Sequence, residues 1–174
     1  MSYPHSTYRI LDVLEDLHDI VSRALDGDLN RRFLEEALGN AQDVINDSHQ
    51  ETDKILQVAT DLAQEDCTLS LAGSIVRRRT GYMVGGDPLV PSVVNPTRKE
   101  LVTFVERARN VYGFSRSHFL GRWTDDDGNV HYDVSELVKG YYTATHLGRK
   151  RGEQEVWSWA HNASLPVQDE KRFR

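Results

Sequence analysis

The stretch HFLGRWTDDDGNVHYDVSELV, residues 118–138, decides the fold that this chain is expected to adopt. Two runs of alternating apolar and polar residues flank the acidic segment DDDGN, in which a glycine suits a β-hairpin turn. The next segment, YYTATHLGRKRGE at residues 141–153, favours a short helix, and EVWSWAH at residues 155–161 favours a final strand. The order strand, strand, helix, strand predicts a small α+β module with an antiparallel sheet.

A helix with a well-marked start precedes this module. Thr97 and Glu100 form a capping-box pattern, and Gly113 suits the C-terminal end. Between them, apolar residues recur at helical spacing: Leu101, Val102, Phe104, Val105, Ala108, Val111 and Tyr112. The large packing residues expected farther on are Trp123, Trp157 and Trp159. We predict one α+β module over residues 97–162, followed by a mobile tail at 163–174.

The segments upstream of the module differ from it in composition. Residues 81–96 are rich in glycine and proline, which predicts a linker. Residues 1–80 are predicted to form an acidic helical region, in which Ser6 or Thr7 caps the first helix and Gly27 ends it. Its three apolar stripes contain Ile10, Val13, Leu14, Leu17, Ile20, Val21, Ala24 and Leu25, then Phe33, Leu34, Ala37, Leu38, Ala41, Val44 and Ile45, then Ile55, Leu56, Ala59, Leu62 and Ala63.

The polar stretch NDSHQETD, residues 46–53, leaves two structures open for the second and third stripes, because it contains neither glycine nor proline. One is a helical hairpin with a turn near Asp47 to Gln50, which we favour for a monomer. The other is a single long helix within residues 30–66. A long helix with an apolar stripe is typical of an oligomer, since the stripe needs a partner to cover it.

Charge is unevenly distributed along the chain. The formal net charge is −6, but residues 1–75 carry 15 acidic and 5 basic side chains, whereas the remainder carries 12 acidic and 16 basic ones. An acidic helical surface suits a basic protein partner, and the candidate binding residues there are Glu35, Glu36 and Asp43. The basic half alternatively suits the acidic half of a second copy, which would form an assembly.

Two basic clusters favour a different class of function, nucleic-acid binding. They are Arg77, Arg78 and Arg79, and Arg149, Lys150 and Arg151. The second cluster could neutralise phosphates while Tyr141 and Tyr142 offer stacking surfaces. Cations also stabilise the C-terminal end of a helix, which explains the second cluster without a ligand. We therefore keep nucleic-acid binding as the alternative to protein binding.

The sequence carries no recognisable motif for catalysis, a cofactor or a metal. It lacks the HExxH, GxxxxGK[ST] and GxGxxG patterns, and the acidic turn from Asp125 lacks the glycine that a calcium loop needs at its sixth position, Val130. His131 beside Asp133 would be a base with an orienting carboxylate, which makes an enzyme the third hypothesis. We expect no cofactor and no enzymatic activity.

Ten residues of the C-terminal module carry a resemblance to a known group of proteins. They are Gly121, Trp123, Gly128, Tyr132, Asp133, Ser135, Val138, Gly148, Gln154 and Trp157. This pattern resembles a poorly characterised segment in proteins of bacteriophages and mobile elements, especially those of actinobacteria. It covers about a quarter of the chain, and it departs from the group at Glu153, where the group has Asn, and at Ser158-Trp159, where the group has an acidic end. The resemblance implies a phage-related origin and a binding or scaffold role.

Together these features predict a non-enzymatic protein-interaction protein of phage or prophage origin. It would be a virion or assembly component, or an accessory factor that binds a host protein. The sole cysteine, Cys67, indicates a reducing compartment, and no apolar run suits a membrane span or a signal peptide. We therefore expect the protein in the host cytoplasm or the virion, with itself or a host or virion protein as partner.

Overall fold

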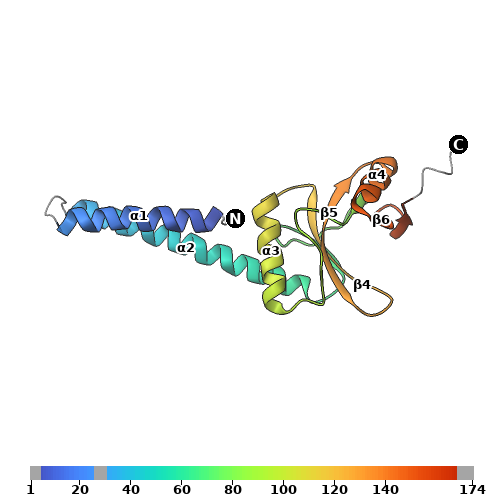
Figure 1. The fold of residues 1–174 in the computed structure, drawn as a ribbon, viewed down its shortest axis with the longest axis horizontal. Helices are drawn as coiled ribbons and strands as arrows, with labels where there is room; N and C mark the ends of the chain where they lie inside the picture. The colour runs from blue at the N-terminus through green and yellow to red at the C-terminus, as the bar shows by residue number, and fades with distance from the viewer. Residues whose placement is uncertain (1–4, 26–30, 168–174) are drawn as a thin grey trace. The chain divides into compact units, whose positions relative to one another are not determined.

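The computed structural model describes residues 5–25 and 31–167 and confirms the α+β fold class. The chain divides into two compact units, Met1–Lys54 and Ile55–Arg174. The elements are α1 (His5–Leu25), α2 (Arg31–Leu62), β1 (Cys67–Ser70), β2 (Tyr82–Val84), β3 (Val93–Val94), α3 (Arg98–Tyr112), β4 (His118–Thr124), β5 (Val130–Val138), α4 (Tyr141–Arg151), β6 (Glu155–Ser158) and β7 (Ala163–Pro166) (Figure 1).

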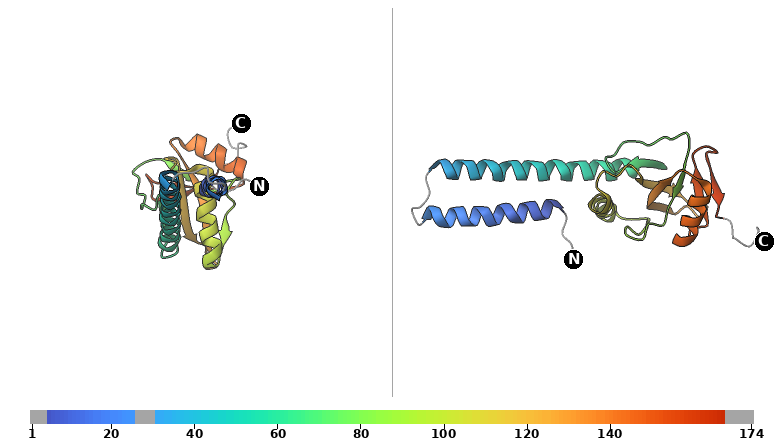
Figure 2. Two further views of the ribbon diagram at one scale, coloured as in Figure 1. Left: turned by 90° about the vertical axis from the view of Figure 1, so that its left-hand side faces the viewer. Right: turned by 90° about the horizontal axis from the view of Figure 1, so that it is seen from above.

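The first unit is a pair of helices, formed by α1 and the first part of α2. They lie side by side and run in opposite directions (Figure 2). α2 continues without a break through the polar stretch 46–53, so the favoured turn near Asp47 to Gln50 is wrong. Nothing in that stretch ends a helix, and Thr52 donates its hydroxyl to the Ser48 carbonyl over 2.9 Å. Gly27 and the side chains of Ser6 and Thr7, the predicted caps of α1, lie outside the described residues.

The second unit is built on a seven-stranded antiparallel sheet. The strand order is β1-β4-β5-β2-β6-β7, and β3 also pairs with β5. The predicted hairpin forms its centre, with His118 to Thr124 of β4 in register with Glu136 to Val130 of β5. The turn that joins them is closed by Asp125, whose carboxylate accepts hydrogen bonds from the backbone N–H groups of Asp127 and Asn129.

Three segments that the sequence places outside the module belong to this sheet. Residues 67–70, expected within the helical region 1–80, instead form β1 and pair with β4. Residues 81–96, expected as a linker, instead contribute β2, which lies between β5 and β6, and β3. Residues 163–166, expected in a mobile tail, form β7 and pair with β6. Val167 follows β7 and donates its backbone N–H to the Gln154 carbonyl, and residues 168–174 of the predicted tail lie outside the described residues.

The larger of the two hydrophobic clusters joins α2, α3 and the sheet. The last turns of α2 contribute Val58, Ala59 and Leu62, and Leu62 is fully buried. The other buried members are Leu69, Leu71, Val90, Leu101, Phe104, Val105, Ala108, Leu120, Tyr132 and Val134. The predicted face of α3 is thus largely confirmed, although Val111 is exposed. The capping box of Thr97 and Glu100 is also confirmed.

A smaller cluster lies under α4, where Val84, Ala144 and Val156 are buried. The three tryptophans belong to neither cluster, although the sequence suggested them as the main packing residues. Trp123 is 46% exposed and stacks on His131, while Trp157 and Trp159 contact each other edge to face. Leucine and valine therefore dominate the described core.

Candidate interaction surfaces

The two helices of the first unit meet along a seam with a seven-residue repeat. On α1 the seam contains Val13, Leu17 and Ile20, all half-buried. On α2 it contains Leu34, Ala37, Ala41, Val44 and Ser48, of which Ala41 is buried and the others are half-buried. In heptad notation these residues occupy positions a and d, the positions that face a partner helix.

A second apolar stripe runs beside this seam and is exposed. Leu14 and Val21 on α1 are 55% and 52% exposed, and Leu38 and Ile45 on α2 are 63% and 45% exposed. Each follows a d residue and therefore occupies heptad position e. We call these four residues the apolar face. The sequence contains the signal for it, because the apolar stripes are wider than a two-helix seam needs.

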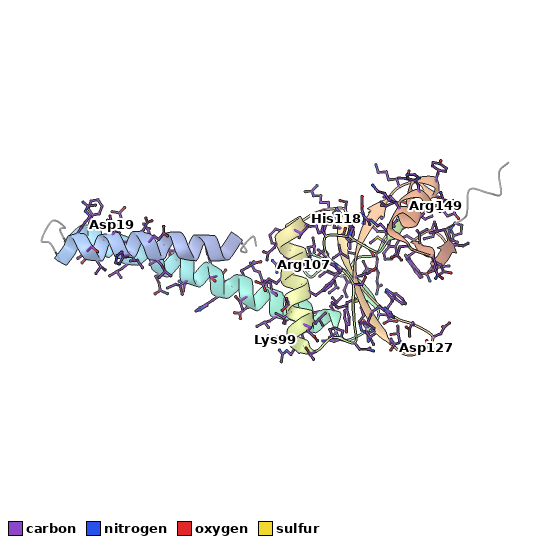
Figure 3. The ribbon with its side chains drawn as sticks, in the orientation of Figure 1. Asp19, Lys99, Arg107, His118, Asp127 and Arg149 are labelled. Carbon is purple, nitrogen blue, oxygen red and sulfur yellow. The ribbon has the colours of Figure 1, made fainter. Side chains whose placement is uncertain are left out.

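The three predicted acidic binding residues are all exposed on α2. Glu35 occupies heptad position b, at the edge of the apolar face, whereas Glu36 and Asp43 occupy position c, on the opposite side of the hairpin. Asp19 on α1 also occupies position c and points away from α2 (Figure 3). The structure therefore does not bring the predicted acidic residues together on one surface.

The first basic cluster, Arg77 to Arg79, is exposed in the second unit. The Arg78 guanidinium lies 5.6 Å from the centre of the Phe119 ring, which is a cation–π contact. Arg78 and Phe119 line a groove of about 280 Å³ together with Arg116 and Phe114. Phe114 is 67% exposed. This groove is thus lined by two cations and two aromatic rings. Of these four residues, only Arg78 was a candidate binding residue in the sequence.

The second basic cluster lies in the last turn of α4, where Lys150 is exposed and Arg149 is half-buried (Figure 3). Arg151 is directed into the fold, with its side chain only 10% exposed. It donates to the Glu136 carboxylate over 2.6 Å and to the carbonyls of Val84 and Gly85 over 3.2 and 3.3 Å. The guanidinium that was predicted to bind a partner is thus held by the protein itself.

Arg151 belongs to a polar network that joins α3, α4 and β5. The Asp87 carboxylate, 2% exposed, lies 3.7 Å from Arg151 and accepts a hydrogen bond from the Tyr112 hydroxyl over 2.7 Å. Burial, followed by the hydrogen bond to Asp87, raises the pKa of Tyr112 to about 12. Because every charge in it has a partner, the network is suited to fixing the two helices on the sheet.

Asp133, one of the ten residues of the pattern described for the C-terminal module, occupies a close-packed position on β5. Its carboxylate touches the space that a Cβ atom would fill at Gly121 and Gly85, so larger residues would clash there. The Ser135 hydroxyl donates to it over 3.2 Å. Burial, opposed by the Ser135 hydrogen bond and assisted by the nearby Glu153 charge, raises the pKa of Asp133 to about 6. The pattern residues Gly121, Asp133 and Ser135 therefore form one contact group.

The raised pKa of Asp133 predicts a pH dependence of stability. Between about pH 4 and pH 6 the folded state binds a proton that the unfolded state has lost, so this group makes stability fall as pH rises. Replacing Asp133 by Asn should raise the free energy of unfolding at pH 7 by roughly 1–2 kcal/mol and remove that decline. Urea unfolding at pH 4, 5, 6 and 7 measures the effect.

Asp125 provides a control, because its pKa is shifted in the opposite direction from that of Asp133. Hydrogen bonds from His131 and Asn129 lower the pKa of Asp125 to about 2, so its contribution to stability is present above pH 4 and is lost as pH falls towards 2. Replacing Asp125 by Asn should therefore lower stability at pH 7. If the Asp133 variant were less stable than the parent at pH 7, or kept the decline between pH 4 and 6, its predicted role would be contradicted.

The proposed histidine–carboxylate pair of the enzyme hypothesis does not form. His131 Nε2 lies 2.8 Å from the Asp125 carboxylate in the turn, and the imidazole stacks on Trp123. It therefore pairs with Asp125 and not with Asp133. Within the described residues, no group of three His, Cys, Asp or Glu side chains could hold a metal ion, and no helix is apolar over a length that would cross a membrane.

Comparisons of the chain with models of protein families, with curated proteins and with solved structures found no match.

Proposed function

We propose that this chain is a non-enzymatic protein-interaction protein of phage or prophage origin, acting as a virion or assembly component or as an accessory factor that binds a host protein. The observation that carries the proposal is the exposed apolar face of the first unit, residues Leu14, Val21, Leu38 and Ile45. Leucine, isoleucine and valine side chains are stabilised by about 1.5–3 kcal/mol each when fully buried, so a contiguous set of them favours a protein partner.

Site-specific photo-crosslinking tests this proposal directly. A photoreactive amino acid in place of Leu38 should form a covalent adduct with a protein in the cells that produce the chain. The same residue in place of Asn40, which is exposed on the opposite side of the hairpin, should give little or none. No protein adduct from position 38, or equal adducts from both positions, would contradict a role for the apolar face.

The groove of Arg78, Arg116, Phe114 and Phe119 supports a second candidate function, binding of single-stranded nucleic acid. Arginine can neutralise phosphate, and an exposed phenylalanine can stack on a base. The anisotropy of a labelled oligonucleotide should then rise with protein concentration, and the affinity should fall steeply with added salt. Replacing Arg78 and Arg116 by Ala should abolish the binding, whereas Lys150→Ala should leave it nearly unchanged. Absent or salt-insensitive binding would remove this candidate.

A further inference from the structure

We infer that the apolar face is occupied by a second copy of this chain, so that two hairpins form a four-helix bundle. This inference rests on the proposed function, because it specifies the partner of the same surface. It is carried by four features of the hairpin: the heptad positions of the exposed residues, the distribution of charge, the size of the face, and the spacing of its apolar residues.

The antiparallel arrangement of the helices gathers the four exposed residues on one side. When two helices run in opposite directions, their e positions flank the seam on the same side and their g positions flank it on the other. Leu14, Val21, Leu38 and Ile45 all occupy e positions. When apolar residues occupy positions a, d and e, the apolar surface of a helix pair is wider than the two helices can bury against each other. Such a surface is typical of a bundle with more helices.

Few charged residues lie on this side of the hairpin. Besides the apolar face, the described residues there at heptad position b are His18, Glu35, Gln42 and His49, so Glu35 is the single carboxylate. The opposite side, at positions c and g, carries Asp16, Asp19, Arg23, Glu36, Asp43, Asp47 and Lys54. Two copies can therefore join by their apolar faces while most of their carboxylates remain in water, where charge is least costly.

The side of the hairpin that carries the apolar face is as large as the interface of a stable dimer. α1 contains 21 residues, which gives a length of about 30 Å, and two helices side by side are about 20 Å wide. A dimer that covers this whole side of the hairpin, with the apolar face within it, would bury roughly 600 Å² on each copy and about 1,200 Å² in total, the lower bound of specific interfaces.

The face is also suited to pairing with itself. Leu14 and Val21 are seven residues apart, and so are Leu38 and Ile45. Each pair therefore spans about 10 Å along its helix, and the face holds two apolar layers. A twofold axis packs α1 of one copy against α1 or α2 of the other, and the shared spacing of seven residues lets the apolar layers coincide in either arrangement.

Sedimentation of the full chain and of charge-changed variants tests the inference. The unmodified chain should sediment at about 40 kDa, twice its mass of 19.9 kDa. Leu38→Glu with Ile45→Glu should raise the dissociation constant more than about a hundredfold and give a monomer, because it places carboxylates in the interface. The control Asn40→Glu with Gln50→Glu adds the same charge at exposed positions on the opposite side and should remain dimeric.

A mixing experiment shows whether the faces meet each other. Leu38→Lys with Ile45→Lys should also be monomeric alone, and an equal mixture of the Lys and Glu variants should restore the mass of about 40 kDa. A monomeric parent chain, or a control that dissociates as fully as the Glu variant, would overturn the inference. In that case a photo-adduct from position 38 with a different protein would still support the proposed function, whereas no adduct at all would remove both.

Discussion

Replacing Leu62 by Ala is expected to lower the free energy of unfolding of the second unit by about 3 kcal/mol. Leu62 is fully buried in the larger hydrophobic cluster, where it ends α2. Its truncation removes apolar burial and leaves a cavity that close-packed neighbours cannot fill. Urea unfolding followed by tryptophan fluorescence measures the loss, because all three tryptophans lie in this unit.

The same substitution at Leu56, less than two turns earlier on α2, is the matched control. Leu56 is 36% exposed, so Leu56→Ala should cost less than about 1 kcal/mol. Equal effects at the two positions would show that the end of α2 is not part of the core of the second unit. The result would then contradict the division of the chain at Ile55.

Replacing Arg151 by Met should be at least as destabilising, by about 3–5 kcal/mol. Methionine keeps much of the volume of the side chain but removes the positive charge. The buried Asp87 carboxylate would then lack its cation, and Glu136 would lose its hydrogen bond of 2.6 Å. Burying a carboxylate without a cation is far more costly than replacing a complete ion pair by apolar groups.

Thermal unfolding of Arg151→Met can be compared with that of Lys150→Met, which changes the neighbouring exposed residue. The Lys150 variant should stay within about 0.5 kcal/mol of the parent. If the two variants were equally stable, Arg151 would be a surface cation and not the centre of a structural network. Arg151 would then again be a candidate for binding phosphate, as the sequence first indicated.

Local features of the fold could be predicted from the sequence because they depend on residues close together in the chain. The capping box of Thr97 and Glu100 needs one helical turn, and the β4–β5 hairpin needs one short loop. Asp127 lies at the tip of that hairpin (Figure 3). Glycine and proline in the segment 81–96 were less informative, because a strand as short as β2 gains its stability from neighbours that are distant in sequence.

The candidate surfaces show the same distinction. Position within a heptad is a local property, so the apolar face of Leu14, Val21, Leu38 and Ile45 was present in the predicted stripes. The role of Arg151 could not be predicted from the sequence, because its partners Asp87 and Glu136 come from separate segments of the chain. The environment of Asp133 likewise depends on Gly85, which reaches it only through the pairing of β2 with β5. Net charge could not predict that Glu35 lies on a different side of α2 from Glu36 and Asp43, since it ignores which side of a helix carries the charge.

The mass of the unmodified chain at low and at high salt tests the central claim most directly. Residues 1–54 carry 12 acidic and 5 basic side chains, so two copies repel each other while their apolar faces attract. The account predicts a dimer of about 40 kDa whose dissociation constant falls as salt screens that repulsion. A chain that stays at 19.9 kDa under both conditions, or an oligomer that dissociates when salt is added, would contradict it.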